Sequence, residues 1–205
     1  MTSAALILFR RLTGDRRGVA ALEMVVMLPI IILFMLGLYD LYTYMRAVDL
    51  LERGSISLAN LVSIRTTQLV DCPATTDSSY IGTYFMATEL ATKPLDLPGS
   101  GMAILSAVIN TTGKPMVSWQ RTTSYAVKNV SSMVGAQGGG ASLPSKLPVL
   151  QDGNDTVVVA ELYYAFDPFA NLRNLFPGLP QVPTLSRVAY YRSRYGGISQ
   201  IASCH

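Results

Sequence analysis

Histidine is almost absent from this sequence of 205 residues, and cysteine and acidic clusters are scarce. The one histidine, His205, stands at the end of the chain, which argues against a nucleophile–base pair. The sequence contains only two cysteines in addition to this histidine, which are too few ligands for a zinc site. In the part of the chain after residue 70, only Asp152 and Asp155 lie close together, whereas a calcium loop needs more oxygen donors at regular spacing. We therefore expect no catalytic residue, no metal site and no cofactor, and predict that the protein is not an enzyme.

Charged residues are also few. They make up 14% of the sequence, against about 25% in typical soluble domains, while half of the residues are hydrophobic. This composition excludes an intrinsically disordered chain. The net charge of +3 comes from residues 1–18, because residues 19–205 carry equal numbers of acidic and basic groups. So small and local an excess does not indicate nucleic-acid binding.

The apolar residues are concentrated directly after this basic leader. Residues 19–39 contain a single charged side chain, Glu23, and as a helix they extend about 31 Å, close to the thickness of a bilayer core. The segment shows no polar face, so we predict a transmembrane helix over residues 19–39. The arginines before it place the N-terminus in the cytoplasm and the remainder of the chain beyond the inner membrane.

The apolar segment has two other interpretations. A cleaved secretory signal peptide needs a small-residue cleavage site after the apolar run, and residues 36–40 offer none. An uncleaved signal anchor fits the composition as well as a processed helix does. Glu23 bears on this choice, since a carboxylate in hydrocarbon costs about 2.5–3.5 kcal/mol and usually has a partner. It could also simply lie at the headgroup boundary.

The residues around Glu23 carry a resemblance. Gly18 follows two arginines and Glu23 is the fifth residue after it, as in type IV prepilins, which a membrane aspartyl peptidase cuts after the glycine. The run Arg-Arg-Gly-Val-Ala-Ala-Leu-Glu-Met-Val-Val-Met-Leu-Pro-Ile-Ile (16–31), with Leu-Gly-Leu-Tyr-Asp (36–40), resembles the TadE/TadF minor pilins (pseudopilins) of tight-adherence (Flp) pilus systems.

The resemblance implies cleavage between Gly18 and Val19 and a helix that stays on the mature protein. Glu23 would then neutralise the new α-amino group of a neighbouring subunit and set the assembly register. It implies partners of four kinds: sibling pseudopilins, the pilus assembly machinery, the prepilin peptidase and inner-membrane lipid. The expected function is to initiate, cap or regulate an adhesive pilus, and the expected location is the bacterial inner membrane or the pilus itself.

The helix should continue outward through residues 40–70. Apolar side chains recur there at steps of three and four, which indicates one helical face. We predict a nearly continuous helix from about Val19 to about Thr67, kinked at Pro29 and bent or closely packed at Gly54. The apolar face either packs under the protein's own outer domain or contacts sibling helices.

Residues 71–205 are predicted to form a periplasmic β-rich domain. Strands are expected over four segments and a short helix, capped near Asp77, over Tyr80–Leu90. The strand segments are 102–109, 116–121, 156–166 and 184–194. The predicted fold class is therefore α+β, a long N-terminal transmembrane helix extending into a small, mainly antiparallel β-sheet domain, as in pilins.

Further features of the outer domain carry weaker predictions. The glycine-rich stretch 134–142 lacks a phosphate-loop ending and is predicted to be a mobile surface connection. Residues 169–183 are expected either to cover the sheet or to present a docking surface. Arg187, Arg192 and Arg194 are expected to form a solvated basic face, with an acidic partner or phospholipid headgroups as the alternative.

The two cysteines, Cys72 and Cys204, are predicted to form a disulfide, because a lone pair in an oxidising periplasm tends to be bonded. Two unpaired thiols are the alternative. The main alternative for the whole protein is an uncleaved single-span anchor whose periplasmic domain binds a ligand or an envelope partner.

Overall fold

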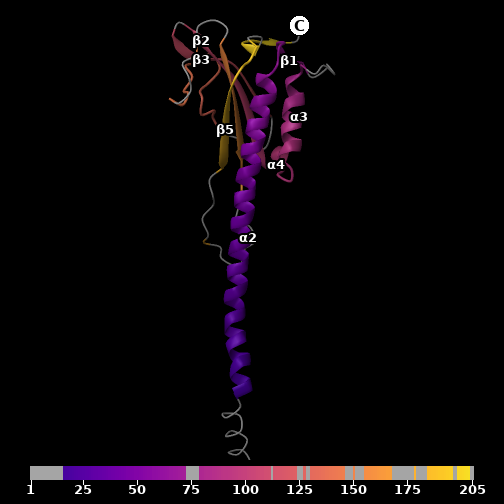
Figure 1. The fold of residues 1–205 in the computed structure, drawn as a ribbon, viewed down its shortest axis with the longest axis vertical. Helices are drawn as coiled ribbons and strands as arrows, with labels where there is room; N and C mark the ends of the chain where they lie inside the picture. Colours follow the sequence, from indigo (N-terminus) through magenta and orange to yellow (C-terminus); the bar gives the residue numbers. More distant parts are fainter. Residues whose placement is uncertain are drawn as a thin grey trace, which may run out of the picture. The chain divides into compact units, whose positions relative to one another are not determined.

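The computed structural model describes residues 16–72, 79–111, 113–123, 127, 130–145, 150, 155–167, 178, 184–195 and 198–203, with the backbone alone for 16–20. The described residues form an α+β structure (Figure 1). The elements are α2 (Arg16–Ser63), β1 (Leu69–Asp71), α3 (Ile81–Ala91), α4 (Leu97–Ser100), β2 (Gly101–Thr111), β3 (Lys114–Thr122), β4 (Thr156–Tyr164), β5 (Leu185–Arg192) and β6 (Ile201–Ser203). The predicted fold class, a long apolar N-terminal helix with a small antiparallel sheet, is confirmed at this level.

The long helix α2 contains 48 residues and runs through both predicted breakers. Pro29 lies inside it, and the kink predicted there remains a prediction. The helix ends at Ser63, about four residues before the predicted end. Thr66 and Thr67 follow, and β-branched residues are poorer helix formers. Residues 69 and 70, which lie in the segment 40–70 predicted to continue the helix, instead belong to strand β1.

The structure divides into two compact units, each described by itself. The first includes α2 as far as Thr43, and the second includes α2 from Tyr44 together with the remaining helices and all the described strands.

The second unit is built on a four-stranded antiparallel sheet in the order β3-β2-β4-β5. All four predicted strand segments are confirmed within a few residues. Strands β2 and β3 form a hairpin, whose turn includes Gly113 with a φ of 79°, a conformation that glycine adopts without steric cost. The pairing of β2 with β3 shifts register between Ala107 and Val108. In this order, β2 pairs with β3 and β4 with β5, and the connection from β3 to β4 crosses over β2.

Helices cover one face of this sheet (Figure 1). Buried side chains of α2, α3 and α4 join those of the strands in one core. The α2 members of this core are Ala47, Leu51, Leu58, Ala59 and Val62. Between them, Gly54 lets α2 approach its neighbours, because an added Cβ would lie 2.4 Å from Thr92 Cγ2 and 2.9 Å from Leu162 Cδ1. The predicted apolar face of the helix thus packs largely within its own domain.

The glycine-rich segment packs against the opposite face of the sheet. Most of its residues are exposed, as predicted for a surface connection, and its predicted mobility stays a prediction. Val134 is buried and belongs to a second core with Val117, Val157 and Val159. The segment also bonds to the backbone of the edge strand β3, where Val117 donates to Gly139 and accepts from Gly138, at 3.0 and 2.8 Å. Glycine composition alone could not reveal this pairing, because the strand that receives the segment is supplied by the tertiary fold.

A second, two-stranded sheet ties the end of α2 to the C-terminal segment. Strands β1 and β6 are parallel, with Asp71 opposite Ser203. The Asp71 carboxylate also pairs with Arg121 of β3 at 2.5 Å. Also in β3, the Trp119 indole N–H donates to the Ile198 carbonyl at 2.8 Å. These contacts hold the C-terminal residues against the main sheet.

Two smaller predictions need correction or fall outside the described residues. Helix α3 matches the predicted helix, but its N-cap is Tyr80 and no side chain caps it; Asp77 lies outside the described residues. Of the segment 169–183, only Gly178 is described, so its predicted roles stay untested.

Candidate functional site

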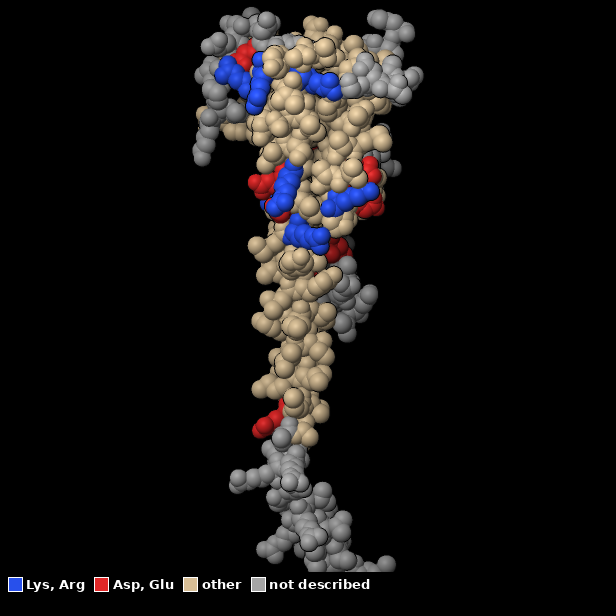
Figure 2. Space-filling view, turned by 45° about the vertical axis from the view of Figure 1, so that its right-hand side comes forward, with Lys and Arg blue, Asp and Glu red and all other residues tan. Residues whose placement is uncertain are grey.

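The most unusual surface of the described structure is the apolar part of α2. Its large apolar side chains from Leu22 to Tyr39 are exposed by 44 to 71%, apart from Leu36, which is half-buried. Figure 2 shows this part of the helix as a long surface without lysine or arginine. Exposed apolar areas of this extent mark membrane or protein contact sites, because the exposure of apolar surface to water is unfavourable in free energy. The helix is long and apolar enough to span a membrane, with a mean hydropathy of 2.5 over its most apolar 18 residues.

The predicted processing and register residues all lie on this helix. Gly18 and Val19 fall in the first turn of α2, and Glu23 follows one turn further on. Around it, Leu22 and Met24 are exposed by 68 and 67%. The helix therefore carries one carboxylate within an exposed apolar segment. No structural observation tests the cleavage or the role of Glu23.

The apolar segment is followed directly by a buried carboxyl. Asp40 is only 5% exposed, and its Oδ2 has no hydrogen-bond partner among the described residues. Its backbone carbonyl accepts the Thr43 hydroxyl at 2.9 Å. The sequence does not show whether a charged residue at the end of an apolar segment is exposed or buried, because burial depends on residues distant in the chain.

The arginines of β5 do not form the predicted basic face. Arg187 stands opposite Leu162 and Arg192 opposite Val157, and adjacent positions of β4 alternate between the two sheet faces. Arg192 pairs with Asp155 of the same chain through two hydrogen bonds, and the alternative of an external acidic partner or phospholipid headgroups stays a prediction. Arg194 lies beyond the end of the strand and donates its backbone N–H to Ser63. Only Arg187 lies on the helix-covered face.

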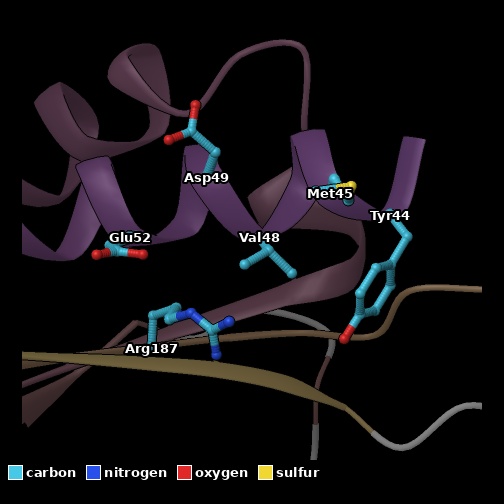
Figure 3. Close-up of a pocket in the computed structure, with 6 residues that line it drawn as sticks. All are labelled: Tyr44, Met45, Val48, Asp49, Glu52 and Arg187. Atoms are coloured by element: carbon cyan, nitrogen blue, oxygen red, sulfur yellow. The ribbon is translucent and has the colours of Figure 1, made fainter. Parts of the chain in front are cut away.

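Arg187 lines a small open cavity of about 270 Å³ between β5 and α2 (Figure 3). The other lining residues are Tyr44, Met45, Val48, Asp49 and Glu52. In Figure 3 the guanidinium reaches from β5 toward the α2 side, where Val48 and Glu52 face it. One Arg187 nitrogen donates to the Ser186 carbonyl at 2.8 Å. Asp49 pairs with Arg53 at 2.9 Å, whereas no ion pair joins Arg187 to Glu52.

The cavity combines groups of opposite charge with an apolar floor. Tyr44 is positioned by Phe166, whose ring centroid lies 6.0 Å from its own. Val48 and Tyr44 both pack against the helix-side core. This arrangement is fixed by packing, so the cavity is a formed feature of the second unit.

A second buried polar cluster lies on the other face of the sheet. Glu161 of β4 is fully buried, and its Oε1 accepts the backbone N–H groups of Met133 and Val134. Burial raises the pKa of this carboxyl. Burial, and then the nearby Glu161 charge, raise the pKa of Tyr163 to about 12. The Tyr163 hydroxyl donates to the Ser131 carbonyl, so the cluster fastens the glycine-rich segment rather than exposing a reactive group.

Within the described ranges, no group of three or more His, Cys, Asp or Glu side chains is placed to hold a metal ion. Cys72 is buried and is not a free thiol. Its predicted partner, Cys204, lies outside the described residues.

Comparison with known proteins adds no assignment: no protein-family model matches this chain, and neither the curated proteins nor the solved structures contain a match. The described residues define an α+β protein and contain one candidate membrane span.

Proposed function

We propose that this chain is a minor pilin of the TadE/TadF kind, inserted in the bacterial inner membrane by α2 and processed between Gly18 and Val19. The observation that carries the proposal is the exposed apolar segment of α2, interrupted by a single carboxylate five residues after Gly18. The helix stores the subunit in the bilayer, with its N-terminus in the cytoplasm and the β-rich domain in the periplasm.

In this proposal, assembly depends on charge pairing within an apolar environment. Cleavage creates an α-amino group at Val19, and Glu23 of one subunit neutralises the amine of a sibling. An unpaired charge in hydrocarbon is costly, so the pairing fixes the register in which the helices pack. The subunit then initiates, caps or regulates a pilus used for surface attachment.

The proposal is tested by the N-terminal mass of the protein in cells with and without a prepilin peptidase. We expect a mature chain beginning at Val19 only when the peptidase is present. A Gly18→Leu variant is the control, because it should stay uncleaved while still inserting in the membrane. Full-length protein in peptidase-positive cells would favour the alternative, an uncleaved single-span anchor with a partner-binding outer domain.

A further inference from the structure

The outer edge of β5 is one of the two edges of the main sheet. Along the other edge, β3 forms backbone hydrogen bonds with the glycine-rich segment at Pro115 and Val117. Within the described residues, no segment pairs with the outer edge of β5 in this way. An edge strand with unpaired backbone groups is a template for a further strand. The described structure therefore covers part of one edge of the sheet and leaves the other open.

The register of β4 and β5 shows which backbone groups face this open edge. Ser193, directly after β5, donates its N–H to the Thr156 carbonyl at 2.7 Å. Because successive residues of an antiparallel strand point their N–H and C=O groups to opposite sides, the odd-numbered residues of β5 bond to β4. The even-numbered residues point these groups away from β4. They are Ser186, Val188, Tyr190 and Arg192.

The cavity lined by Arg187 lies beside this edge (Figure 3). The Arg187 guanidinium donates to the outward-facing carbonyl of Ser186 at 2.8 Å, so it lies at the edge itself. Helix α2 forms the other wall of the cavity. Further along, the Arg194 N–H, just beyond β5, donates to the carbonyl of Ser63 at the end of α2. A groove thus lies between the strand edge and the helix, wholly within the second unit.

A groove of this kind suits an added strand. Main-chain hydrogen bonds to the open edge supply affinity, and side-chain pockets beside the edge supply specificity. Alternate side chains of an added strand point to the helix-covered face, where the cavity of about 270 Å³ receives them. The Ser186 carbonyl can accept an N–H of the added strand while it stays bonded to Arg187, because a carbonyl oxygen has two lone pairs.

The side chains of the groove restrict what the added strand carries. Arg187 makes no ion pair with the described residues that line the cavity, and the Glu52 carboxylate faces it from α2 (Figure 3). Arg187 attracts a carboxylate placed between them but Glu52 repels it, and an ammonium meets the reverse. A side-chain amide satisfies both groups, because its oxygen accepts from the guanidinium and its NH₂ donates to the carboxylate. Tyr44 and Val48 supply an apolar wall beside them.

We propose that the outer edge of β5 binds an extended segment of a partner protein as an additional antiparallel strand. The backbone of this segment bonds to Ser186 and Val188. A glutamine of the segment stands opposite Arg187, with its amide between the guanidinium and Glu52, and an apolar side chain two positions later packs on Tyr44. This inference does not depend on membrane insertion, cleavage or pilus assembly.

The test is fluorescence anisotropy with the full chain in detergent and the labelled peptide Lys-Thr-Thr-Thr-Gln-Thr-Leu-Thr-Lys. We expect saturable binding, and binding about tenfold weaker when alanine replaces the glutamine, because a hydrogen bond to a charged group has about that effect. N-methylation of the two threonines that flank the glutamine removes N–H groups that face β5 and should abolish binding. N-methylation of the glutamine itself is the matched control, because its N–H faces away from β5.

Variants of the chain test the same contacts from the other side. Arg187→Gln should weaken binding about tenfold and remove the preference for the glutamine peptide over the alanine peptide. Val188→Pro removes an outward N–H and should abolish binding, while an edge strand tolerates proline where the N–H faces solvent. Arg46→Gln is the matched control, because Arg46 is exposed on α2 and does not line the cavity. Circular dichroism of each variant checks the fold.

Three results would overturn the proposal. The first is the absence of saturable binding to the wild-type chain up to about 1 mM peptide. The second is equal binding of the two N-methylated peptides, which would show that the peptide does not pair with the edge. The third is self-association of the wild-type chain that Val188→Pro abolishes, which would assign the edge to a second copy. Because the assay contains neither peptidase nor sibling subunits, its failure is distinguishable from failure of the pilin proposal.

Discussion

The Glu161 carboxylate, in the middle of β4, accepts the backbone N–H of Met133 with 2.9 Å between Oε1 and N. The same oxygen accepts the N–H of Val134 at 3.2 Å, while Oε2 has no hydrogen-bond partner among the described residues. One buried carboxyl therefore fastens the glycine-rich segment to the sheet, and it does so without a counter-ion. Because burial disfavours the charged form, the pKa of Glu161 lies above its usual 4.5.

This raised pKa predicts how stability depends on pH. The folded state binds the Glu161 proton more tightly than the unfolded chain does. The contribution of Glu161 to stability is therefore complete below pH 4.5 and is lost as the pH rises through the folded pKa. In Glu161→Gln the side chain stays neutral, and its carbonyl oxygen can still accept both N–H groups. We expect the variant to match the wild type near pH 4 and to exceed it at pH 7.5, measured by thermal unfolding in detergent.

The control for this prediction is Glu161→Ala, which removes the acceptor for both N–H groups and should be less stable than Glu161→Gln at every pH. A wild type that gains stability over Glu161→Gln as the pH rises would contradict the predicted sign.

The close contact of Gly54 predicts a second effect on stability. A methyl group added at Gly54 meets Thr92 and Leu162, both buried, so the core must shift. Overpacking of this kind costs about 1–3 kcal/mol, more than the roughly 1 kcal/mol that alanine gains over glycine in a helix. We expect Gly54→Ala to lower the unfolding temperature and Gly54→Val to lower it further.

The matched control is Gly37→Ala on the same helix, where an added Cβ meets nothing within 4 Å. That variant should leave the unfolding temperature unchanged or raise it. Equal effects of the two alanine substitutions would show that the packing at Gly54 does not limit stability.

The predicted disulfide stays a prediction. Strand β1 ends at Asp71, directly before Cys72, and pairs with β6, which ends at Ser203. We predict that Cys72 and Cys204 are bonded, which closes a loop of about 130 residues and stabilises the protein by up to about 4–5 kcal/mol. Mass spectrometry after alkylation without reductant should detect no modified cysteine. Two alkylated thiols would refute the bridge.

The role proposed for Glu23 predicts a defect confined to assembly. In Glu23→Gln the chain should still insert and be cleaved, because the apolar segment and Gly18 are unchanged. It should fail to co-purify with sibling pseudopilins, since a neutral amide no longer compensates the Val19 amine. Glu89→Gln on α3 is the matched control and should assemble normally. Normal association of the Glu23 variant would favour an anchor that does not use this carboxylate.

Local sequence pattern was sufficient to predict much of the fold. The 3.6-residue periodicity of α2 and the β-branched run of β4 identified both elements, because such patterns reflect which faces are buried. It also isolated Glu23 as the only charge in the apolar segment. The exact end of α2 was not predicted. The residues after it form β1, which pairs with β6, more than 130 residues away in the chain. The cavity was not predicted either, because Arg187 and Glu52 line it from different elements that come together only at the helix–sheet interface.

The sequence by itself determined that this protein has one long helix with an apolar segment, in which Glu23 is the only charged residue, and an outer β-rich domain. These properties depend on composition and on spacing along a single element. Only the tertiary structure decided that the glycine-rich segment is pinned to β3, that Glu161 and Asp40 are buried, and that the β5 arginines belong to different faces. Each of these depends on which distant segments come together, and hydrogen bonding and burial are settled by those neighbours rather than by local propensity.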